Sequence, residues 1–331
     1  MKVLLTGATG FLGQRVARLL RERGADVRCA VRPSSNLNDL QNAVGNSLWN
    51  GIETVCGDLN DSEFCRRATD GCEQIYHVAA GVTGSPAVMF LNTVVPTRRL
   101  IDAALQTGCE RFILVSSLGV YGTRHLRRGA DLTEACPLDP QPHLRDGYTY
   151  SKVVQEEVAW EAHRDRGLPL VVVRPGVIIG PGRGALSARI GLKLGPLQTR
   201  FGSFRRMPYV YVDNCAAAVV QAGQVPHIEG ESFNALDDNL PTGRQVLKTY
   251  SKLGKRVHSL WIPQLAVGPL ISLYEWYHHY SQGQLPGTLT RYRSDSFWKA
   301  LRFTNDKAKS RLQWKPQVPM DEALRRSILG S

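Results

Sequence analysis

The stretch Thr6-Gly7-Ala8-Thr9-Gly10-Phe11-Leu12-Gly13 stands between an apolar run, residues 2–5, and an amphipathic pattern over residues 13–23. Its three glycines permit a tight turn, a close approach of the backbone to a phosphate group, and close packing of a helix on a strand. The helix that follows presents free N–H groups and the positive end of its dipole at the turn. The stretch therefore predicts a strand, a phosphate-binding turn and a helix, as in a dinucleotide-binding unit.

The rest of the first half alternates short apolar runs with amphipathic, helix-like stretches. Because the runs are almost continuously apolar, they are typical of parallel strands covered on both faces by helices. We therefore predict an α/β fold with a doubly wound parallel sheet of the Rossmann type, and a ligand-binding crevice at the carboxyl ends of its strands. The predicted strands are residues 2–5, 26–31, 53–56, 74–78, 111–116 and 170–173.

The alternation ends after Gly176, where residues 180–207 are rich in Gly, Pro and Arg. Residues 209–212 resume a strand-like pattern, and we expect this part of the chain to return to the main sheet. The expected division is residues 1–175 plus 208–237 for the dinucleotide-binding domain, and residues 176–207 plus 238–331 for a smaller C-terminal lobe that binds the substrate.

The composition describes a globular protein with a basic surplus. Hydrophobic residues make up 43% of the 331 residues, which excludes a disordered or fibrous chain. The net charge of +12 is spread along the chain without a basic tail or an aromatic–basic repeat. We therefore expect a solvated basic surface rather than a nucleic-acid-binding protein. An anionic cofactor, and a small-molecule substrate for which an anionic group is one option, would use part of this field.

Cysteines and apolar stretches bear on where the protein is found. Its seven cysteines form no C-x-x-C pair and no cluster with histidines at metal-ligand spacing, so we expect reduced thiols, no metal site and a cytoplasmic protein. The chain starts with a strand-like run, which leaves no room for a signal peptide. The stretch 260–277 contains Pro263, Pro269 and Glu275. We expect it to be a packed or surface-lying helix, with membrane contact as the less favoured alternative.

The end of the second predicted strand bears on which dinucleotide is bound. An NAD site has an acidic residue there for the ribose hydroxyls, whereas an NADP site has an arginine near the 2′-phosphate. The chain reads Ala30-Val31-Arg32-Pro33-Ser34-Ser35, so Arg32 with Ser34 or Ser35 favours NADP, and NAD is the alternative. Asp58, after the third strand, either accepts from the adenine amino group or caps the next helix.

Three residues suggest hydride transfer at an alcohol carbon. Ser117 follows the fifth predicted strand, and Tyr148 and Lys152 are four residues apart at the start of a helix, so that both face one side. A tyrosine with its reference pKa of about 10 is almost fully protonated at neutral pH. We expect Lys152 and the positive ring of an oxidised nicotinamide to lower that pKa, so that Tyr148 acts as a general acid or base. Ser117 would hold the substrate oxygen, whereas Tyr150 is expected only to pack.

Together these motifs resemble the extended short-chain dehydrogenase/reductases, the NAD-dependent epimerase/dehydratase family. The resemblance implies that Ser117, Tyr148 and Lys152 are catalytic and that Asn92 supports them. It also implies that the backbone after Arg174-Pro175-Gly176 meets the nicotinamide amide. It rests on the glycine turn, Gly57-Asp58-Leu59, His77-Val78-Ala79-Ala80, Asn92, Ser116-Ser117, Tyr148 with Lys152, and Arg174-Pro175-Gly176.

The pattern and the resemblance together define the expected cofactor site. Its residues are Gly7, Thr9, Gly10, Phe11, Leu12, Gly13, Arg32, Ser35, Asp58, Leu59, Val78, Ala79, Ala80, Tyr148, Lys152, Pro175, Gly176 and Val177. We also expect the protein to be a homodimer.

Departures from the family pattern bear on the substrate. The chain has Val177 where sugar-nucleotide epimerases of the family usually have Asn, and Pro96 where they usually have Gly. The segments around Arg32 and after Arg174 are more similar to the dihydroflavonol-reductase and 3β-hydroxysteroid-dehydrogenase branches. A set of basic residues points instead to a diphosphate or another anionic group, with a plain basic surface as its alternative. This set is Arg183, Arg189, Lys193, Arg200, Arg205, Arg206, Arg291 and Arg293.

Three functions are therefore compared. The leading one is an NADP-dependent oxidoreductase that acts on a secondary alcohol or its ketone in a small molecule. The second is a nucleotide-sugar epimerase or dehydratase with a tightly bound cofactor, in which the hydride returns to the same substrate. The third is a non-catalytic dinucleotide sensor. The set of Ser117, Tyr148 and Lys152 argues against the sensor, because sensing needs only the nucleotide site.

Overall fold

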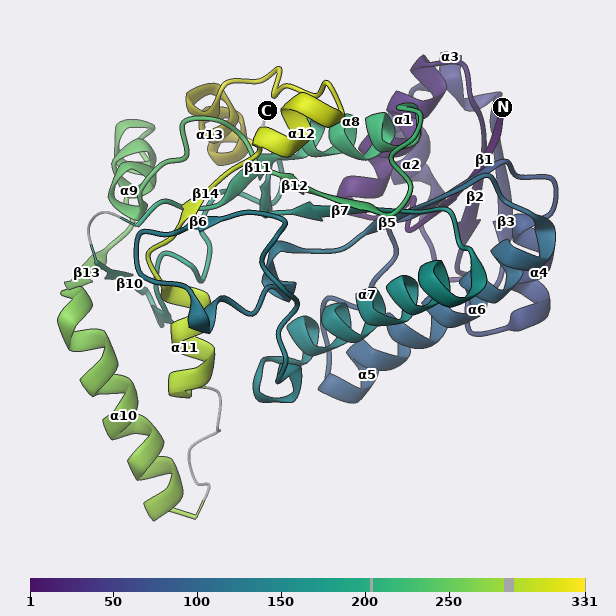
Figure 1. Cartoon of the computed structure of the whole chain (residues 1–331). Coiled ribbons are helices and arrows are strands. Elements are labelled where there is room, and N and C mark those ends of the chain that lie inside the picture. Colours follow the sequence, from purple (N-terminus) through teal and green to yellow (C-terminus); the bar gives the residue numbers. More distant parts are fainter. Residues whose placement is uncertain (203–204, 283–288, 331) are drawn as a thin grey trace.

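A seven-stranded parallel sheet forms the centre of the molecule (Figure 1). The structure is a computed structural model that describes residues 1–202, 205–282 and 289–330. The strand order is β12-β7-β5-β4-β1-β2-β3, and all neighbours run parallel. The chain thus winds outward in both directions from β1 and β4, which confirms the predicted doubly wound sheet. Its strands are β1 (Lys2–Thr6), β2 (Asp26–Val31), β3 (Ile52–Cys56), β4 (Gln74–His77), β5 (Arg111–Val115), β7 (Leu170–Pro175) and β12 (Glu231–Ala235).

Helices cover both faces of this sheet, because successive residues of a strand point to opposite sides. In β1, Val3 and Leu5 lie in one apolar core and Leu4 lies in a second one. The first core includes residues of α1 (Phe11–Glu22), α2 (Leu37–Val44) and α8 (Val212–Ala222). The second includes residues of α4 (Ser62–Thr69), α6 (Val94–Thr107) and α7 (Gly147–Arg166). Short helices α3 (Asn46–Trp49) and α5 (Pro86–Leu91) lie between these elements in the chain.

The C-terminal part adds small sheets and helices at the β12 end of the large sheet (Figure 1). Within the described residues, β9 (Lys193–Leu194), β10 (Leu197–Phe201) and β13 (Ser259–Ile262) form one of them. Two further pairs join β8 (Val177–Ile179) to β11 (Tyr209–Tyr211), and β6 (Asp131–Leu132) to β14 (Arg302–Phe303). The helices here are α9 (Gly243–Lys252), α10 (Gln264–Tyr280), α11 (Arg291–Trp298), α12 (Asp306–Arg311) and α13 (Met320–Leu329).

The return of residues 208–237 to the main sheet is only partly as expected. Strand β12 pairs with β7 in the large sheet, whereas β11 pairs with β8 outside it. The chain leaves the sheet at Gly176, where a Cβ atom would lie 2.1 Å from the carbonyl oxygen of Pro208. Residues Tyr209–Tyr211 thus form the predicted strand, but their expected place in the main sheet is wrong, because they pair with β8. The division into two domains remains a prediction.

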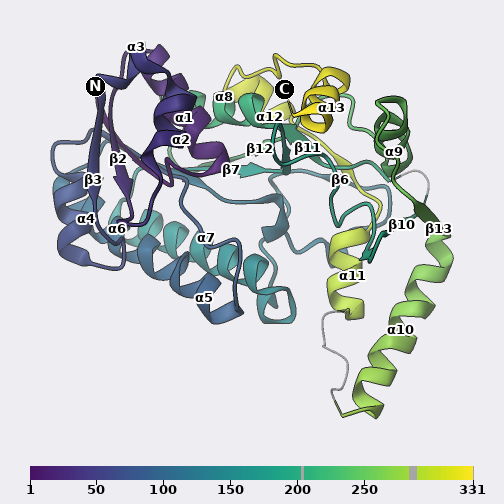
Figure 2. The same cartoon turned by 180° about the vertical axis from the view of Figure 1, so that it is seen from behind.

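Helix α10 projects from the body of the molecule beside α11, as the views from both sides show (Figures 1 and 2). It covers most of the stretch 260–277, for which a helix is predicted. In the part of the chain that the structure describes, no helix has both the length and the apolar character needed to cross a bilayer.

Candidate active site

The turn between β1 and α1 has the geometry of a phosphate-binding loop. Gly7 has a φ of +71°, in the left-handed region that favours glycine. A Cβ atom at Gly13 would lie 1.9 Å from the carbonyl oxygen of Gly7, so this position also requires glycine. Gly10 caps α1 without a side-chain hydrogen bond, which leaves the first N–H groups of the helix open to a ligand. The turn therefore fits the diphosphate of a dinucleotide.

A cavity of 1080 Å³ opens at the carboxyl ends of the strands. It brings together most of the residues that the sequence proposes for catalysis and cofactor binding. Its other wall comes from residues 178–193 and 289–298, which lie in the part of the chain predicted as a C-terminal lobe and are called the lobe side below. The proposed residues that line it are Gly7, Gly10, Phe11, Leu12, Gly13, Val78, Ala80, Ser117, Tyr148, Lys152, Pro175, Gly176 and Val177.

Ser117 and Tyr148 both line this cavity. Ser117 follows β5 and its Oγ accepts from the backbone N–H of Gly119 at 3.1 Å. Tyr148 lies in the first turn of α7, which begins after Asp146, whose carboxylate accepts from the N–H of Thr149 at 3.0 Å. Burial raises the pKa of the Tyr148 phenol, and the nearby Ser117 side chain opposes this rise. The phenol is therefore a proton donor at neutral pH.

Lys152 is buried and anchored away from the phenol. Its Nζ donates to the carbonyl oxygen of Val115 at 2.8 Å and to Oε1 of Gln155 at 2.8 Å. Burial lowers the pKa of Lys152 to about 7, and the charge of Glu156 opposes this. The groups that favour the Tyr148 phenolate are Ser117 and Arg183. The Lys152 ammonium group donates to Val115 and Gln155, and its expected effect on the pKa of Tyr148, together with that of an oxidised nicotinamide, stays a prediction.

A chain of buried hydrogen bonds joins Lys152 to the glycine turn. Gln155 Nε2 donates to Thr97 Oγ1 at 2.8 Å, and Thr97 Oγ1 lies 2.8 Å from His77 Nε2. The other ring nitrogen of His77 lies 2.7 Å from Thr6 Oγ1, at the end of β1. Burial lowers the pKa of His77 to about 3, so its ring is neutral. Sequence reasoning missed Gln155 and Thr97, since nothing in their local pattern distinguishes them.

Several proposed residues lie outside the cavity lining: Thr9, Arg32, Ser35, Asp58, Leu59, Ala79 and Asn92. Arg32 follows β2 and donates from Nη2 to Asn92 Oδ1 at 3.1 Å, while its backbone N–H donates to Ser35 Oγ at 3.1 Å. Asn92 ends α5, and its Nδ2 donates to the carbonyl oxygen of Val88 at 2.8 Å. The hydrogen bonds of the Asn92 side chain therefore join it to Arg32 and Val88 rather than to Ser117 or Tyr148, because it stands at the end of α5.

The remaining outlying residues use their polar groups within the fold. Asp58 accepts from the N–H of Asn60 at 2.9 Å, and α4 is capped by Asp61 instead, so the alternative that Asp58 caps it is wrong. The Ala79 N–H donates to Thr6 Oγ1 at 3.2 Å. The carbonyl oxygens of Thr9 and Leu59 accept from Gln14 and Cys65.

The backbone after Arg174 is also engaged. The N–H of Gly176 donates to the carbonyl oxygen of Ala235 at 3.1 Å, and the N–H of Val177 donates to that of Pro208 at 2.7 Å. Neither N–H is therefore left for a nicotinamide amide, although both residues line the cavity. If the nicotinamide amide contacts the backbone here, the contact must use an atom other than these two N–H groups.

The lobe side of the cavity is basic and aromatic. Of the basic set singled out in the sequence, Arg183, Arg189, Lys193 and Arg293 line the cavity, whereas Arg200, Arg205, Arg206 and Arg291 do not. Arg205 is instead buried and donates to the carbonyl oxygens of Phe201, Trp298 and Arg189. The lining residues that were not proposed for the site from the sequence are Val82, Val115, Ser116, Leu118, Gly119, Arg145, Asp146, Thr149, Ile178, Gly182, Leu192, Leu289, Ser294, Phe297 and Trp298.

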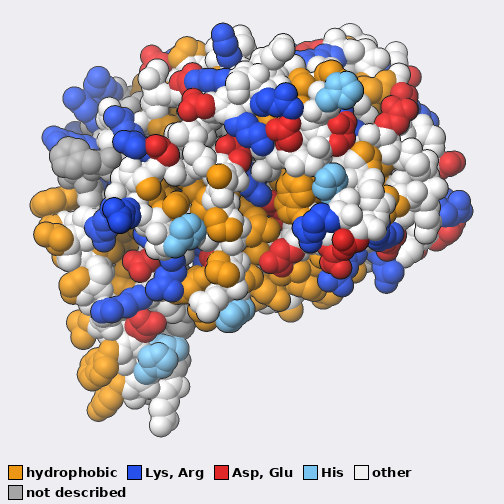
Figure 3. Space-filling model, viewed as in Figure 1, with side chains coloured by type: hydrophobic (Ala, Val, Ile, Leu, Met, Phe, Trp, Pro, Cys, Tyr) orange, Lys and Arg blue, Asp and Glu red, His pale blue; other side chains and the backbone are white. Residues whose placement is uncertain are grey.

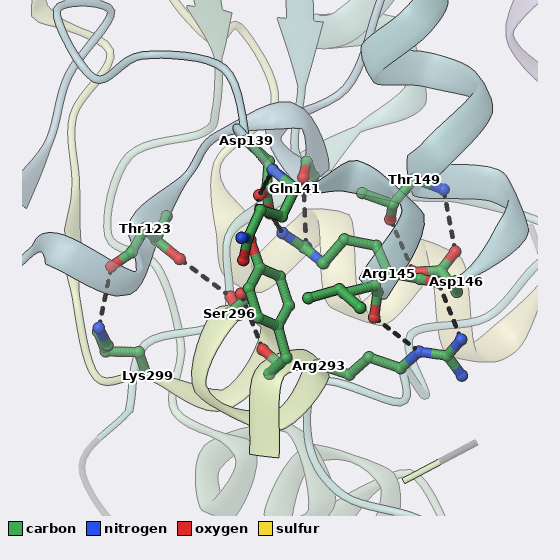
Figure 4. A network of polar contacts seen from close by, with 12 residues as sticks. Thr123, Asp139, Gln141, Arg145, Asp146, Thr149, Arg293, Ser296 and Lys299 are labelled. Carbon is green, nitrogen blue, oxygen red and sulfur yellow. Dashed lines mark hydrogen bonds and ion pairs between the residues drawn. The ribbon is translucent and has the colours of Figure 1, made fainter. Parts of the chain in front are cut away.

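A buried ion pair connects this wall to the rest of the site (Figure 4). Arg145 Nη1 donates to Asp139 Oδ2 at 2.5 Å, and both side chains are almost fully buried. From α11, the Tyr292 hydroxyl donates to Asp139, and Arg293 Nη2 donates to the carbonyl oxygen of Arg145 at 2.9 Å. The segment before α7 is thereby tied to the C-terminal lobe. Among the described residues, no group of three His, Cys, Asp or Glu side chains is placed to hold a metal ion.

Known proteins share this architecture. Cinnamoyl-CoA reductase 1 from Petunia hybrida is 34% identical over 185 residues, which cover 54% of this chain and 55% of that protein. Cinnamoyl-CoA reductase 1 from Arabidopsis thaliana is 31% identical over 237 residues, or 69% of this chain and 68% of that protein. A UDP-glucuronic acid 4-epimerase from Bacillus cereus in complex with NAD shares the fold, with a TM-score of 0.73 at 19% identity over 100% of this chain and 98% of that one. The model of the NAD dependent epimerase/dehydratase family matches residues 3–235, and the chain belongs to this family.

Proposed function

We propose that this protein is an NADP-dependent oxidoreductase that transfers hydride between the nicotinamide and a secondary alcohol or ketone of a small molecule. The observation that carries the proposal is that Ser117, Tyr148 and Lys152 line one cavity together with the open N-terminus of α1. The names of the cinnamoyl-CoA reductases among its relatives also favour a reductase.

The protonation state of the site favours reduction of a carbonyl. Burial keeps Tyr148 protonated, so it can donate its proton to a substrate oxygen that Ser117 holds in place. When bound, the reduced nicotinamide supplies the hydride that adds to the carbonyl carbon. The carbonyl oxygen takes the Tyr148 proton, the product is the alcohol, and the phenolate regains a proton from solvent. In the reverse direction Tyr148 acts as the base.

Arg32 supports the choice of NADP over NAD. It stands directly after β2, and the residue before it is Val31 rather than an acidic residue. Its guanidinium is held by the uncharged Asn92, so the positive charge remains available for a 2′-phosphate. Ser35, whose Oγ accepts from the N–H of Arg32, lies beside it in the same turn. The adenine contact of Asp58, the homodimer and the cytoplasmic location remain predictions.

A nucleotide-sugar epimerase or dehydratase is the second candidate. The observation in its favour is the basic lobe wall of Arg183, Arg189, Lys193 and Arg293, which suits an anionic substrate. The family of the chain also includes epimerases by its description.

The experiment that separates the two is a panel of ketones, alcohols and nucleotide sugars assayed for consumption of reduced or oxidised nicotinamide. An oxidoreductase consumes cofactor in proportion to product, and NADP should support faster turnover than NAD. Conversion of a nucleotide sugar without net consumption of cofactor would identify the epimerase. Conversion of no panel member, together with tight cofactor binding, would contradict the oxidoreductase.

A further inference from the structure

Helix α10 is apolar on two sides, and the described residues of the chain cover only one of them. On the inner side, Val267 and Ile271 are buried in a cluster with Phe201 and Trp298. The outer side carries large side chains that remain exposed: Leu265 (87%), Leu270 (51%), Leu273 (60%), Trp276 (58%), Tyr277 (42%) and Tyr280 (73%). Isolated exposed apolar residues are ordinary, but a contiguous set of this kind marks a site of interaction.

The spacing of these residues makes one continuous surface. With 3.6 residues per turn, positions 265, 269, 273, 276 and 280 fall on one side of the helix. The rings of Trp276 and Tyr280 stack at 5.4 Å between their centroids. Figure 3 shows hydrophobic side chains along the outer edge of the projecting helix. We call this surface the outer face of α10: Leu265, Pro269, Leu270, Leu273, Trp276, Tyr277 and Tyr280.

The segment that leads into α10 is strongly basic. Between Asp238 and Glu275 the sequence contains no acidic residue and five basic ones: Arg244, Lys248, Lys252, Lys255 and Arg256. The exposed Trp261 of β13 pairs in register with Arg200 of β10. Burial lowers the pKa of Arg200, and the charge of Arg244 lowers it further. Positive charge is therefore present beside β13, the strand that leads into α10. Glu275, the one acidic residue of α10, accepts from the backbone N–H of Arg291.

We propose that the outer face of α10 and the basic segment before it bind an anionic lipid surface, with the helix lying in the headgroup region. Trp and Tyr favour this region because their rings are apolar at one end and polar at the other. Lys and Arg are attracted to the negative surface potential of anionic lipids. A projecting helix also offers a convex surface, which suits a deformable layer better than a groove.

A second copy of this chain is a poorer partner for the same surface. Pairing two outer faces in the same orientation brings together two basic segments, with no acidic residue between Asp238 and Glu275 to compensate. Like charges that face one another across an interface disfavour the complex. A layer of anionic lipid can bury the apolar side chains of the outer face and also attract the basic segment before it.

Lipid binding would also place the cavity near the lipid surface. The inner side of α10 packs in the same cluster as Leu192, Leu289, Phe297 and Trp298, and these four residues line the cavity. The docking helix is therefore one layer of side chains away from the cavity wall. The proposal does not depend on the reaction that the site catalyses.

The test is sedimentation of the purified full chain with vesicles of phosphatidylcholine that contain phosphatidylglycerol, compared with phosphatidylcholine alone. We expect binding to the anionic vesicles and its loss as salt is raised, since salt screens the attraction. Leu273→Glu and Trp276→Glu change exposed residues, so folding should be kept, and each should weaken binding about tenfold or more. Lys252→Glu combined with Arg256→Glu should weaken binding to the anionic vesicles without any change in the outer face.

Leu329→Glu is the matched control, because Leu329 is a 43% exposed leucine on α13 and its replacement should leave vesicle binding unchanged. Absence of wild-type binding to anionic vesicles at low salt would overturn the proposal. Equal binding by wild type and Leu273→Glu would do the same. If analytical ultracentrifugation shows that Leu273→Glu converts a dimer to a monomer and the wild type ignores vesicles, the outer face is a contact between copies.

Discussion

The two walls of the cavity differ in the source of their residues and in what holds them. Gly7, Ser117 and Tyr148 come from the ends of β1 and β5 and the start of α7, where backbone hydrogen bonds fix their positions. The opposite wall takes Arg189 from a loop and Phe297 from α11, both in the C-terminal lobe. The guanidinium of Arg189 stacks on Phe297 at 4.5 Å. The sheet wall therefore suits the shared chemistry, and the lobe wall suits the choice of substrate.

The walls are joined at Asp139, which accepts from Arg145 in the segment before α7 and from Tyr292 in α11. If the comparison is right, changes on the sheet side alter turnover or cofactor binding. Changes at the junction lower the free energy of unfolding. Lobe residues 183–202, which lie outside the junction, differ from the sheet mainly in their rate of hydrogen exchange.

The largest effect is expected at Tyr148. Tyr148→Phe removes only the hydroxyl, and general acid–base groups contribute about 10²–10⁴-fold to rate, so kcat should fall by that order. Cofactor affinity, measured by calorimetry, should stay near that of the wild type. Tyr150→Phe is the control, since the Tyr150 ring stacks on Phe90 with centroids 6.0 Å apart. Full activity of Tyr148→Phe, or an inactive Tyr150→Phe, would show that the catalytic assignment is wrong.

The junction is tested by Asp139→Asn, which leaves the buried Arg145 without its counter-charge. Breaking a buried ion pair at one partner costs about 3–5 kcal/mol, and the free energy of unfolding from urea titration should fall by that amount. Asp131→Asn is the matched control, because Asp131 pairs with Arg302 at the exposed surface. It should leave the unfolding free energy nearly unchanged. Equal losses of unfolding free energy in the two variants would show that the buried pair at the junction contributes no more than an exposed pair.

Cofactor choice is tested by Arg32→Ala. A charge-assisted hydrogen bond contributes about 1.5–3 kcal/mol, so NADP affinity should fall roughly tenfold to hundredfold. NAD affinity should barely change, because NAD has no 2′-phosphate. Calorimetry on both cofactors measures this difference, and an unchanged NADP affinity would contradict the role of Arg32.

His77 should make stability depend on pH. Its pKa is about 3 in the folded chain and about 6.5 when unfolded, so below pH 6.5 the unfolded chain binds the extra proton. The contribution is present in full above pH 6.5 and is lost as pH falls toward 3. Between pH 6.5 and 5 the loss is about 2 kcal/mol. Urea titrations of wild type and His77→Gln at both pH values should differ by this amount, since the other groups are common to both chains. Parallel pH profiles would show that His77 is not the cause.

The smallest effect is expected in hydrogen exchange. Without substrate, residues 183–202 should exchange faster than β1 and β5, because residues 183–192 lie outside helices and strands, whereas β1 and β5 lie in the buried centre of the large sheet. Exchange mass spectrometry with and without a confirmed substrate measures this. Uniformly slow exchange in both regions would remove the contrast between the two walls.

Short-range patterns were enough to predict the doubly wound sheet and the glycine turn after β1. The glycine turn, the alternating runs and the Tyr148/Lys152 spacing each depend on residues close in the chain, where backbone sterics and helix periodicity act. The same reasoning could not identify the residue that caps α4, because two aspartates stand close together before this helix. Asp61, and not Asp58, caps α4, because the helix begins three residues later than the carboxylate alone suggests.

The sequence by itself determined the doubly wound sheet and the glycine turn at the end of β1. Only the tertiary structure decided that Lys152 bonds to Val115 and Gln155, and that Tyr292 meets Asp139 across 153 positions of the chain. It also decided which side of α10 stays exposed, since the sequence of α10 places apolar residues on more than one side of the helix. The physical reason is that periodicity shows which residues share a face, whereas burial and partners depend on how distant elements pack.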